Sequence, residues 1–421
     1  MKYLFFLLSS ILLLSSCQKD DSEGNTPPAP AKRTVLVFMS AENNLTGYTD
    51  NDINEMIQGR KQVGDDCDLL FYCDHASKTE KPFIARIRNN TSQPIDTLYH
   101  YPTDFYSTES SHFMEILQRM TQLSPAKEYA LVFWGHANGW ILENDGVNTI
   151  RRAYGVDNGD NDPSSKVKEP ARWLNIPDMA QCFKQLGIHW KFIFFDCCNM
   201  QNVEVAYELR NATDYIIASP AEITGSGAPY NTMVPDFFIE DGEQMGIKMC
   251  EDYNAQFDYV GGHLPISVIA TNKMQALADA TRQVLPEIAN WLKTENPTKG
   301  IIYYYNYDSD YNKGYFPEFG KVMYDMNDMI RAALANEPEK YEKWKKAFFE
   351  AVFYAETSTK WHANTIQFSD FEVTEEKFGG MSMFFPLSKY EQSEHKYNEE
   401  IMKMQWYQAV GWQVPAVIFL A

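Results

Sequence analysis

The chain has 421 residues, of which 44% are hydrophobic, and a formal net charge of −20. This apolar content is sufficient for one large or two modest cores. The net charge argues against nucleic acid as a partner, because phosphate contacts need clustered Lys and Arg, and it favours basic polypeptides. The seven cysteines are too scattered for a disulfide framework and lack the C-x-x-C spacing of metal sites.

Residues 1–17 have the features of a bacterial lipoprotein signal peptide. Lys2 precedes an apolar run over residues 3–14 that is too short to span a bilayer. The run leads into Leu14-Ser15-Ser16-Cys17, which resembles a lipobox, so we expect Cys17 to be lipidated in the mature chain. Residues 18–32 are predicted to form a flexible tether between the lipid anchor and the folded domain. We expect an outer-membrane lipoprotein that is either periplasmic or surface-exposed. The alternative is an ordinary signal peptide with an incidental cysteine.

From residue 33 to 421, short apolar runs alternate with amphipathic stretches. This alternation predicts a single α/β domain with a mainly parallel sheet and helices on both faces. The predicted strands are residues 34–39, 69–73, 129–134, 192–195, 215–219 and 265–271. The predicted helices are residues 50–60, 110–123, 176–186, 201–210, 242–257, 273–291 and 337–353. We also expect a C-terminal α+β extension, in which residues 296–374 are a possible subdomain.

Two of the predicted strands end in residues that carry chemistry. One strand leads into His136, and the other leads into Asp196, Cys197 and Cys198. If the two strands are parallel neighbours, an imidazole and a thiol meet at one edge of the sheet, as nucleophilic thiol catalysis requires. We also expect the N–H groups of the helix that follows to stabilise the thiolate. The alternative for each thiol is a buried cysteine with a packing role.

These motifs resemble those of the clostripain-like cysteine peptidases, which are relatives of the caspases, gingipains and legumains. The family pattern W-x-H-G is matched by Trp134-Gly135-His136-Ala137, and F-D-A-C-L-M is matched by Phe195-Asp196-Cys197-Cys198-Asn199-Met200. The pattern V-E-V-A-Y follows at residues 203–207. The alanine of the family falls on Cys197 and its nucleophile falls on Cys198. The resemblance implies a caspase-like three-layer sandwich and an endopeptidase that forms a thioester acyl-enzyme.

The resemblance also implies a role for each site residue. His136 would deprotonate Cys198 or hold it as an ion pair, and would then protonate the leaving amine, while the backbone N–H groups of Cys198 and Ala137 would form the oxyanion hole. Asp196 would lie in the S1 pocket and pair with Arg or Lys of the substrate. Its alternative role is to cap the following helix. Ala137 replaces the usual glycine of the family, and Ser226 stands where a second acidic residue is frequent.

The polar segment over residues 141–173 carries two further predictions. Asp157, Asp160 and Asp162 are candidate Ca²⁺ ligands, although their spacing does not match an EF-hand and solvated carboxylates are the alternative. Family members commonly cut themselves after a basic residue between the His and the Cys. Arg151 and Arg152 are therefore the predicted self-cleavage sites. No organic cofactor is expected.

A second hypothesis is a catalytically inactive surface lipoprotein that binds peptide or glycan with the same fold. The departures at Ala137 and Ser226 and the adjacent Cys197-Cys198 pair keep this hypothesis open. A disulfide between the two cysteines would also block the nucleophile until it was reduced.

Overall fold

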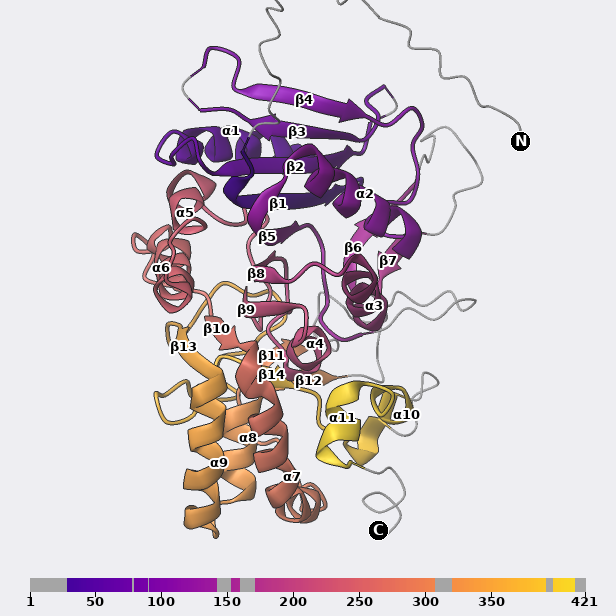
Figure 1. The fold of residues 1–421 in the computed structure, drawn as a ribbon. Coiled ribbons are helices and arrows are strands. Elements are labelled where there is room, and N and C mark those ends of the chain that lie inside the picture. Colours follow the sequence, from indigo (N-terminus) through magenta and orange to yellow (C-terminus); the bar gives the residue numbers. More distant parts are fainter. Residues whose placement is uncertain are drawn as a thin grey trace, which may run out of the picture.

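A nine-stranded sheet organises the computed structural model (Figure 1), which describes residues 29–77, 79–89, 91–141, 153–159, 171–306, 320–390 and 397–412. The strand order is β13-β10-β9-β8-β5-β1-β2-β3-β4. These strands are β1 (Ala31–Ala41), β2 (Asp68–His75), β3 (Phe83–Ile87), β4 (Ile95–His100), β5 (Ala126–Trp134), β8 (Trp190–Asp196), β9 (Thr213–Ala218), β10 (Ile266–Ala270) and β13 (Val352–Glu356). All six strands predicted from apolar runs are present.

The centre of the sheet is parallel and its two edges are antiparallel. The strands β2, β1, β5, β8 and β9 run parallel to their neighbours, while β3 and β4 on one side and β10 and β13 on the other are antiparallel. The inner strands are apolar along both faces, since helices cover both sides. Carboxyl ends of parallel strands are where ligands bind in such sheets.

Helices pack on both faces of this sheet, as predicted. One face carries α1 (Thr49–Arg60), α5 (Tyr230–Asp236) and α6 (Gly242–Ala255), and the other carries α2 (Ser110–Leu123), α3 (Ile176–Leu186) and α4 (Val203–Leu209) (Figure 1). Gly187 ends α3 with a φ of 66°, a left-handed conformation that glycine adopts freely. The result is the predicted three-layer α/β sandwich.

The C-terminal extension contributes both to the main sheet and to a second sheet. The second sheet has the order β11-β12-β14, and β13 of the extension pairs with β10 of the main sheet. The remaining elements are η1 (Thr46–Tyr48), β6 (Tyr154–Asp157), β7 (Arg172–Leu174), η2 (Thr271–Lys273), α7 (Met274–Trp291), β11 (Tyr303–Asn306), β12 (Lys321–Asp325), α8 (Met326–Ala333), α9 (Pro338–Ala351), β14 (Ser382–Met383), η3 (Ser388–Tyr390), α10 (Tyr397–Ile401) and α11 (Gln405–Val410). Buried Glu204 of α4 accepts a hydrogen bond from the Phe384 N–H, so the extension also contacts the helix behind the site.

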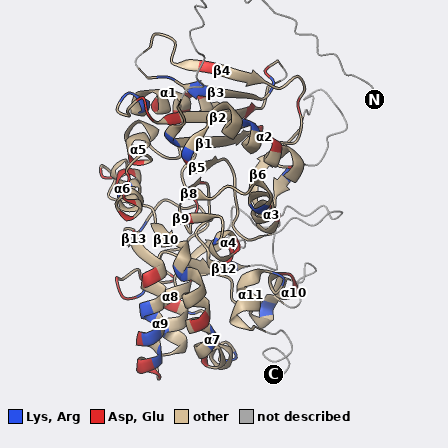
Figure 2. Cartoon of the chain, viewed as in Figure 1, with Lys and Arg blue, Asp and Glu red and all other residues tan. Residues whose placement is uncertain are grey.

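The main sheet begins earlier in the chain than predicted. β1 begins at Ala31, so residues 31 and 32 belong to the sheet and not to the predicted tether, while the predicted lipidation site Cys17 lies outside the described residues. Among the helices that the structure describes, none is long and apolar enough to cross a bilayer. Acidic and basic side chains are interspersed along α9 (Figure 2), where Lys340 pairs with Glu287 of α7.

Candidate active site

The sheet brings the two chemical motifs together at one edge. β5 and β8 are parallel neighbours in which Trp134 pairs with Asp196, so His136 and Cys198 each follow the paired position by two residues. The segments that continue from these strands also contact each other, because the Asn199 side chain donates to Asn138 Oδ1 at 3.2 Å. The imidazole and the thiol therefore leave adjacent strands at the same carboxyl edge, as the sequence predicted.

The segment that carries His136 turns sharply at Gly135. A Cβ atom at residue 135 would lie 2.9 Å from the Ser40 carbonyl oxygen, and the φ of 141° is accessible to glycine. Beyond this turn, His136 Nε2 lies 2.7 Å from Asn44 Oδ1, which accepts its hydrogen. This bond makes Nε2 the protonated nitrogen of the neutral ring, so Nδ1 is the basic one. Sequence reasoning did not assign a role to Asn44.

Cys198 is a partly exposed thiol held against the loop that follows β9. The backbone N–H of Ile223 donates to its Sγ at 3.4 Å. Burial raises the pKa of the Cys198 thiol to about 12, and the nearby carboxylates of Glu222 and Asp196 add to the effect, while the Ile223 N–H opposes it. The thiol is therefore protonated in this state, so a base has to deprotonate it before it can act as a nucleophile.

Cys197 faces the interior. Its side chain is fully buried, and its Sγ donates to the Phe133 carbonyl oxygen at 3.3 Å. Burial and the Asp196 carboxylate raise the pKa of Cys197 well above the usual range. Both Cys197 and Cys198 are free thiols in this structure. Successive side chains of an extended segment point to opposite sides, which is why only one of the two thiols reaches the edge.

The predicted support of the thiolate by a helix N-terminus is wrong. α4 begins at Val203, five positions after Cys198 (203 − 198), and its N-cap Asn202 accepts the Val205 N–H. Between them the chain makes an irregular turn in which Asn199 has a φ of 59°. Because Asn202 already caps the helix, Asp196 does not cap it, and the alternative role for that carboxylate is excluded.

Asp196 is instead enclosed by the loop after β9. Its Oδ2 accepts hydrogen bonds from the Ala228 N–H at 3.0 Å and the Tyr230 hydroxyl at 2.9 Å. Its Oδ1 is buried and has no hydrogen-bond partner in the described part of the chain. Burial raises the pKa of Asp196 to about 6, and the two hydrogen bonds oppose that rise. Oδ2 of Asp196 is thus held by two hydrogen bonds, whereas Oδ1 accepts none from the described residues.

Comparison with known proteins gives the family. The sequence model of the clostripain family matches residues 37–416. The chain belongs to the clostripain family. A secreted C11 cysteine protease from Bacteroides thetaiotaomicron, solved in complex with an irreversible peptide inhibitor, is 27% identical, with 91% of this chain and 100% of that chain covered and a TM-score of 0.71. An inactive zymogen C11 protease from Parabacteroides distasonis has the same fold at 24% identity, with coverage of 91% and 99% and a TM-score of 0.70.

These matches confirm a clostripain-family cysteine peptidase with a caspase-like α/β fold. A comparison with curated proteins finds no match. The matches do not test the individual site residues, so the roles below are argued from the geometry of this chain.

Two further acidic residues of this clostripain-family chain lie near Asp196. On α1, Glu55 Oε2 accepts the Tyr230 N–H at 3.0 Å, and Asp52 Oδ2 accepts the Trp134 indole N–H at 2.6 Å. Burial raises the pKa of Asp52 to about 8, and the negative charge of Asp196 adds to that rise. Ser226 is exposed and its hydroxyl pairs with Thr224. Glu55 and Asp52 of α1 therefore lie near Asp196, while Ser226 brings no charge to the loop.

The change from glycine to Ala137 has no conformational cost. Non-glycine residues with positive φ in the described chain are Asn199, Asn296 and Met323, and Ala137 is not among them. Ala137 forms a bridge with Tyr154 through two hydrogen bonds, from Asn138 N to Ala153 O and from Gly155 N to His136 O. Neither bond uses the Ala137 N–H, which supports the oxyanion role.

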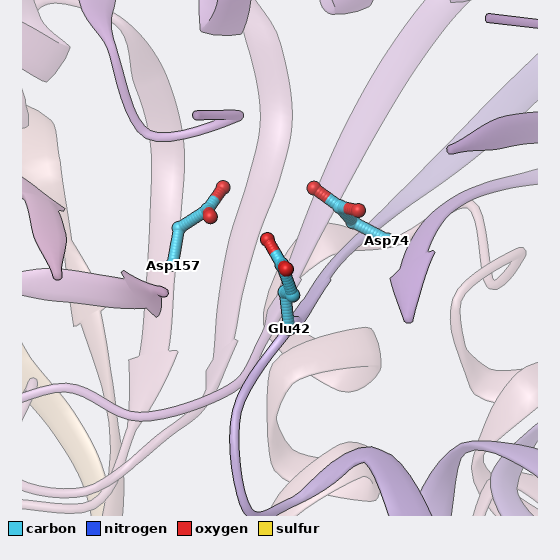
Figure 3. Close-up of side chains that lie close together, drawn as sticks. All are labelled: Glu42, Asp74 and Asp157. Atoms are coloured by element: carbon cyan, nitrogen blue, oxygen red, sulfur yellow. The ribbon is translucent and has the colours of Figure 1, made fainter. Parts of the chain in front are cut away.

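The predictions for the polar segment have mixed outcomes. Arg151, Arg152, Asp160 and Asp162 lie outside the described residues. Asp157 ends β6 and is fully buried, with its carboxylate facing Glu42 and Asp74 (Figure 3). The acidic neighbours of Asp157 in the described structure are therefore Glu42 and Asp74, which the spacing within the segment did not indicate.

Proposed function

We propose that this clostripain-family chain is an endopeptidase that cleaves after Arg or Lys, with Cys198 as the nucleophile and His136 as base and acid. The observation that carries the proposal is the pairing of Trp134 with Asp196 on neighbouring parallel strands. His136 and Cys198 each follow this pair by two residues. A 27% identical C11 protease binds a peptide inhibitor irreversibly, which supports polypeptide substrates for this chain.

The reaction follows from the positions of the polar atoms. Nδ1 of His136 takes the proton from Cys198 as Sγ attacks the scissile carbonyl carbon, because Asn44 already accepts the hydrogen on Nε2. The N–H groups of Cys198 and Ala137 stabilise the oxyanion. The imidazolium then protonates the leaving amine, and a water molecule activated by the same ring hydrolyses the thioester. Asn44 is a positioning residue, since it acts through His136.

The preference for a basic side chain rests on the charge around Asp196. A buried carboxylate with one unpaired oxygen and, among the residues that the structure describes, no cationic partner favours a ligand that brings a positive charge and N–H donors. Glu55 of α1 adds to the negative potential at Asp196, whereas Asp52, whose pKa burial raises to about 8, is neutral near pH 7. The ring of Tyr48, which is 40% exposed, lies next to Gly225 of the loop that encloses Asp196, so this loop has an exposed aromatic surface beside it. Arg and Lys side chains match this combination of charge and apolar surface.

Two further parts of the proposal concern processing and location. Cleavage after Arg151 or Arg152 would activate the chain, and the relative from Parabacteroides distasonis, an inactive zymogen, is consistent with such a step. Lipidation of Cys17 would anchor the mature protein to the outer membrane. Mass spectrometry of the purified mature protein tests both, because a diacylglyceryl group and a cut after residue 151 or 152 each give a defined mass.

The test of the nucleophile uses a matched pair of variants. Fluorogenic peptides with Arg, Lys or Ala before the scissile bond are incubated with the wild type, Cys198→Ala and Cys197→Ala in the presence of reductant. We expect Cys198→Ala to lose at least about 1,000-fold in kcat/KM, and Cys197→Ala to keep most of the activity. Equal turnover by the wild type and Cys198→Ala would refute the proposal, and loss only in Cys197→Ala would move the nucleophile by one position.

A further inference from the structure

Tyr253 of α6 lies beside the proposed specificity pocket. Phe194, Asp196 and Cys198 alternate along β8 and the segment that follows it, so their side chains point to the same face of the sheet. α6 packs on that face, where the ring centroids of Tyr253 and Phe194 are 6.3 Å apart. The tyrosine therefore lies on the same side of β8 as the carboxylate and the nucleophile.

The C-terminal end of α6 also contacts the loop that encloses Asp196. The Gln256 side-chain amide donates to the Gly227 carbonyl oxygen at 3.3 Å and to the Tyr253 carbonyl oxygen at 2.9 Å. Gly227 in turn lies against the carboxylate, because a Cβ atom at this residue would be 2.6 Å from Asp196 Oδ2. The helix end, the loop and the carboxylate are therefore packed together around the pocket.

The hydroxyl group of Tyr253 is buried and unpaired. The residue is 1% exposed, and its hydroxyl forms no hydrogen bond within the part of the chain that the structure describes. Burial raises the pKa of Tyr253 well above its usual range, and the charges of Asp196 and then Cys198 add to the effect, so the hydroxyl keeps its proton. Buried hydroxyl groups without a hydrogen bond are unfavourable and uncommon. This one therefore needs an explanation.

Two unsatisfied groups thus come to the same region from different elements. Asp196 Oδ1 is an acceptor without a donor, and the Tyr253 hydroxyl can accept a hydrogen bond as well as donate one. Tyr230 is the other tyrosine at this carboxylate, and its hydroxyl is already used on Oδ2. A side chain with several N–H donors and a positive charge would satisfy both groups. Arginine carries five such donors and lysine carries three.

We propose that Tyr253 is a specificity-determining residue of this pocket, an inference that rests on the proposed function. Its hydroxyl oxygen accepts one N–H of the substrate Arg or Lys side chain, while Asp196 Oδ1 accepts another. A norleucine side chain would leave both groups unpaired, and a site with buried polar groups rejects a ligand that cannot bond to them. Both groups are buried in this structure, so we expect entry of the substrate side chain to displace the exposed loop residues Gly225 and Ser226.

The competing explanation is that Tyr253 only packs against Phe194. In that case its hydroxyl takes no part in substrate recognition, and removal of the oxygen leaves the substrate preference unchanged. Tyr253→Phe separates the two explanations, because it deletes one oxygen and keeps the ring. The variant should not melt below the wild type, since the hydroxyl has no partner to lose among the residues that the structure describes.

The experiment compares Tyr253→Phe with the wild type on matched fluorogenic peptides that carry Arg, Lys or norleucine before the scissile bond. We expect kcat/KM to fall at least about 10-fold for Arg and Lys, because a hydrogen bond to a charged group is lost. The norleucine value should stay the same or rise, since the variant has no hydroxyl to leave unpaired. A general packing defect would instead lower all three values by the same factor.

Tyr215→Phe is the matched control. Tyr215 is partly buried and lies against Gly242, the first residue of α6. At 1.5 Å per residue, this end of the helix is about 16 Å from Tyr253. The control removes the same atom from a tyrosine at the other end of the same helix, so it should keep the wild-type ratio of Arg to norleucine.

A binding measurement separates failure of this inference from failure of the proposed function. Labelled peptides with Arg or norleucine are titrated into Cys198→Ala, with and without Tyr253→Phe, and Kd is read from fluorescence anisotropy. If the wild type cleaves no Arg or Lys peptide, the proposed function fails, yet a loss of at least about 10-fold in Arg binding alone would still support the role of Tyr253. The inference is overturned if Tyr253→Phe keeps the wild-type ratio of Arg to norleucine in kcat/KM or, where there is no turnover, in Kd.

Discussion

Replacing Asp196 with Asn tests the proposed specificity pocket with little change of shape. Asp196 Oδ2 accepts from Ala228 N and the Tyr230 hydroxyl, so the amide oxygen of the variant has to occupy that position. The amide NH₂ group then replaces Oδ1, the oxygen without a partner. An arginine of the substrate would meet a donor where it had an acceptor, and would lose its charge-assisted hydrogen bond.

The magnitude follows from the loss of one buried charge pair. Truncating one partner of such a pair costs about 3 kcal/mol, within the usual range of 2–5, which is about 100-fold in kcat/KM. Glu55 remains, so some preference for basic residues should persist. The assay compares kcat/KM for matched peptides with arginine or norleucine before the scissile bond, and we expect the norleucine value to change less than about threefold.

The control for Asp196→Asn is Glu222→Gln, which removes a second carboxylate that influences Cys198. Glu222 accepts from the Thr365 hydroxyl at 2.9 Å and does not contact Asp196 in the described structure. If the arginine preference depends on Asp196 itself, Glu222→Gln should keep it. The reasoning fails if Asp196→Asn lowers both substrates by the same factor, or if its arginine preference equals that of the wild type.

Three further predictions address the same site. The ratio of kcat/KM for arginine over norleucine should rise with pH through about 6 and then level off, since Asp196 loses its proton there; a ratio that is flat between pH 5 and 8 would contradict this. Gly227→Ala should lower arginine turnover at least about tenfold and reduce stability by about 1–2 kcal/mol in a thermal melt, because its φ is 60° and the new Cβ would lie 2.6 Å from Asp196 Oδ2; wild-type melting would refute the strain. Asn44→Ala should lower kcat about tenfold with little change in KM and displace the limb of the pH profile that reports His136, because the ring loses the acceptor at Nε2; an unchanged profile would leave Asn44 without a positioning role.

The parts of the fold that the sequence predicted are those that are buried on both faces. The strands β1, β2, β5, β8 and β9 are runs of apolar residues, because helices cover them on both sides. The edge strand β4 was missed, since its residues are half-buried or exposed and its composition resembles that of a loop. A strand that is buried on both faces is recognisable as an apolar run in the sequence, whereas an edge strand of mixed exposure has no such run.

The residues of the site also divide into those that the sequence predicted and those that it did not. His136 and Cys198 were predictable because each follows an apolar strand, and alternation sends Cys197 inward to Phe133. Asn44 was not, because its contact with His136 spans 92 positions and depends on β1 lying beside β5. The acidic partners on α1 were missed for the same reason. Local patterns identify the residues that react, while the residues that hold and charge them are set by tertiary contacts.

The order of the central strands has a consequence for a processed enzyme. A cut after Arg151 or Arg152 would leave β1, β2 and β5 on one polypeptide and β8, β9 and β10 on the other, yet β5 and β8 are hydrogen-bonded neighbours at the middle of the sheet. Tyr154, close to the new N-terminus of the second polypeptide, would also keep its bridge to Ala137 of the first. The two fragments would therefore elute together in size-exclusion chromatography and separate only in denaturant. Size exclusion under native conditions would not detect the cleavage.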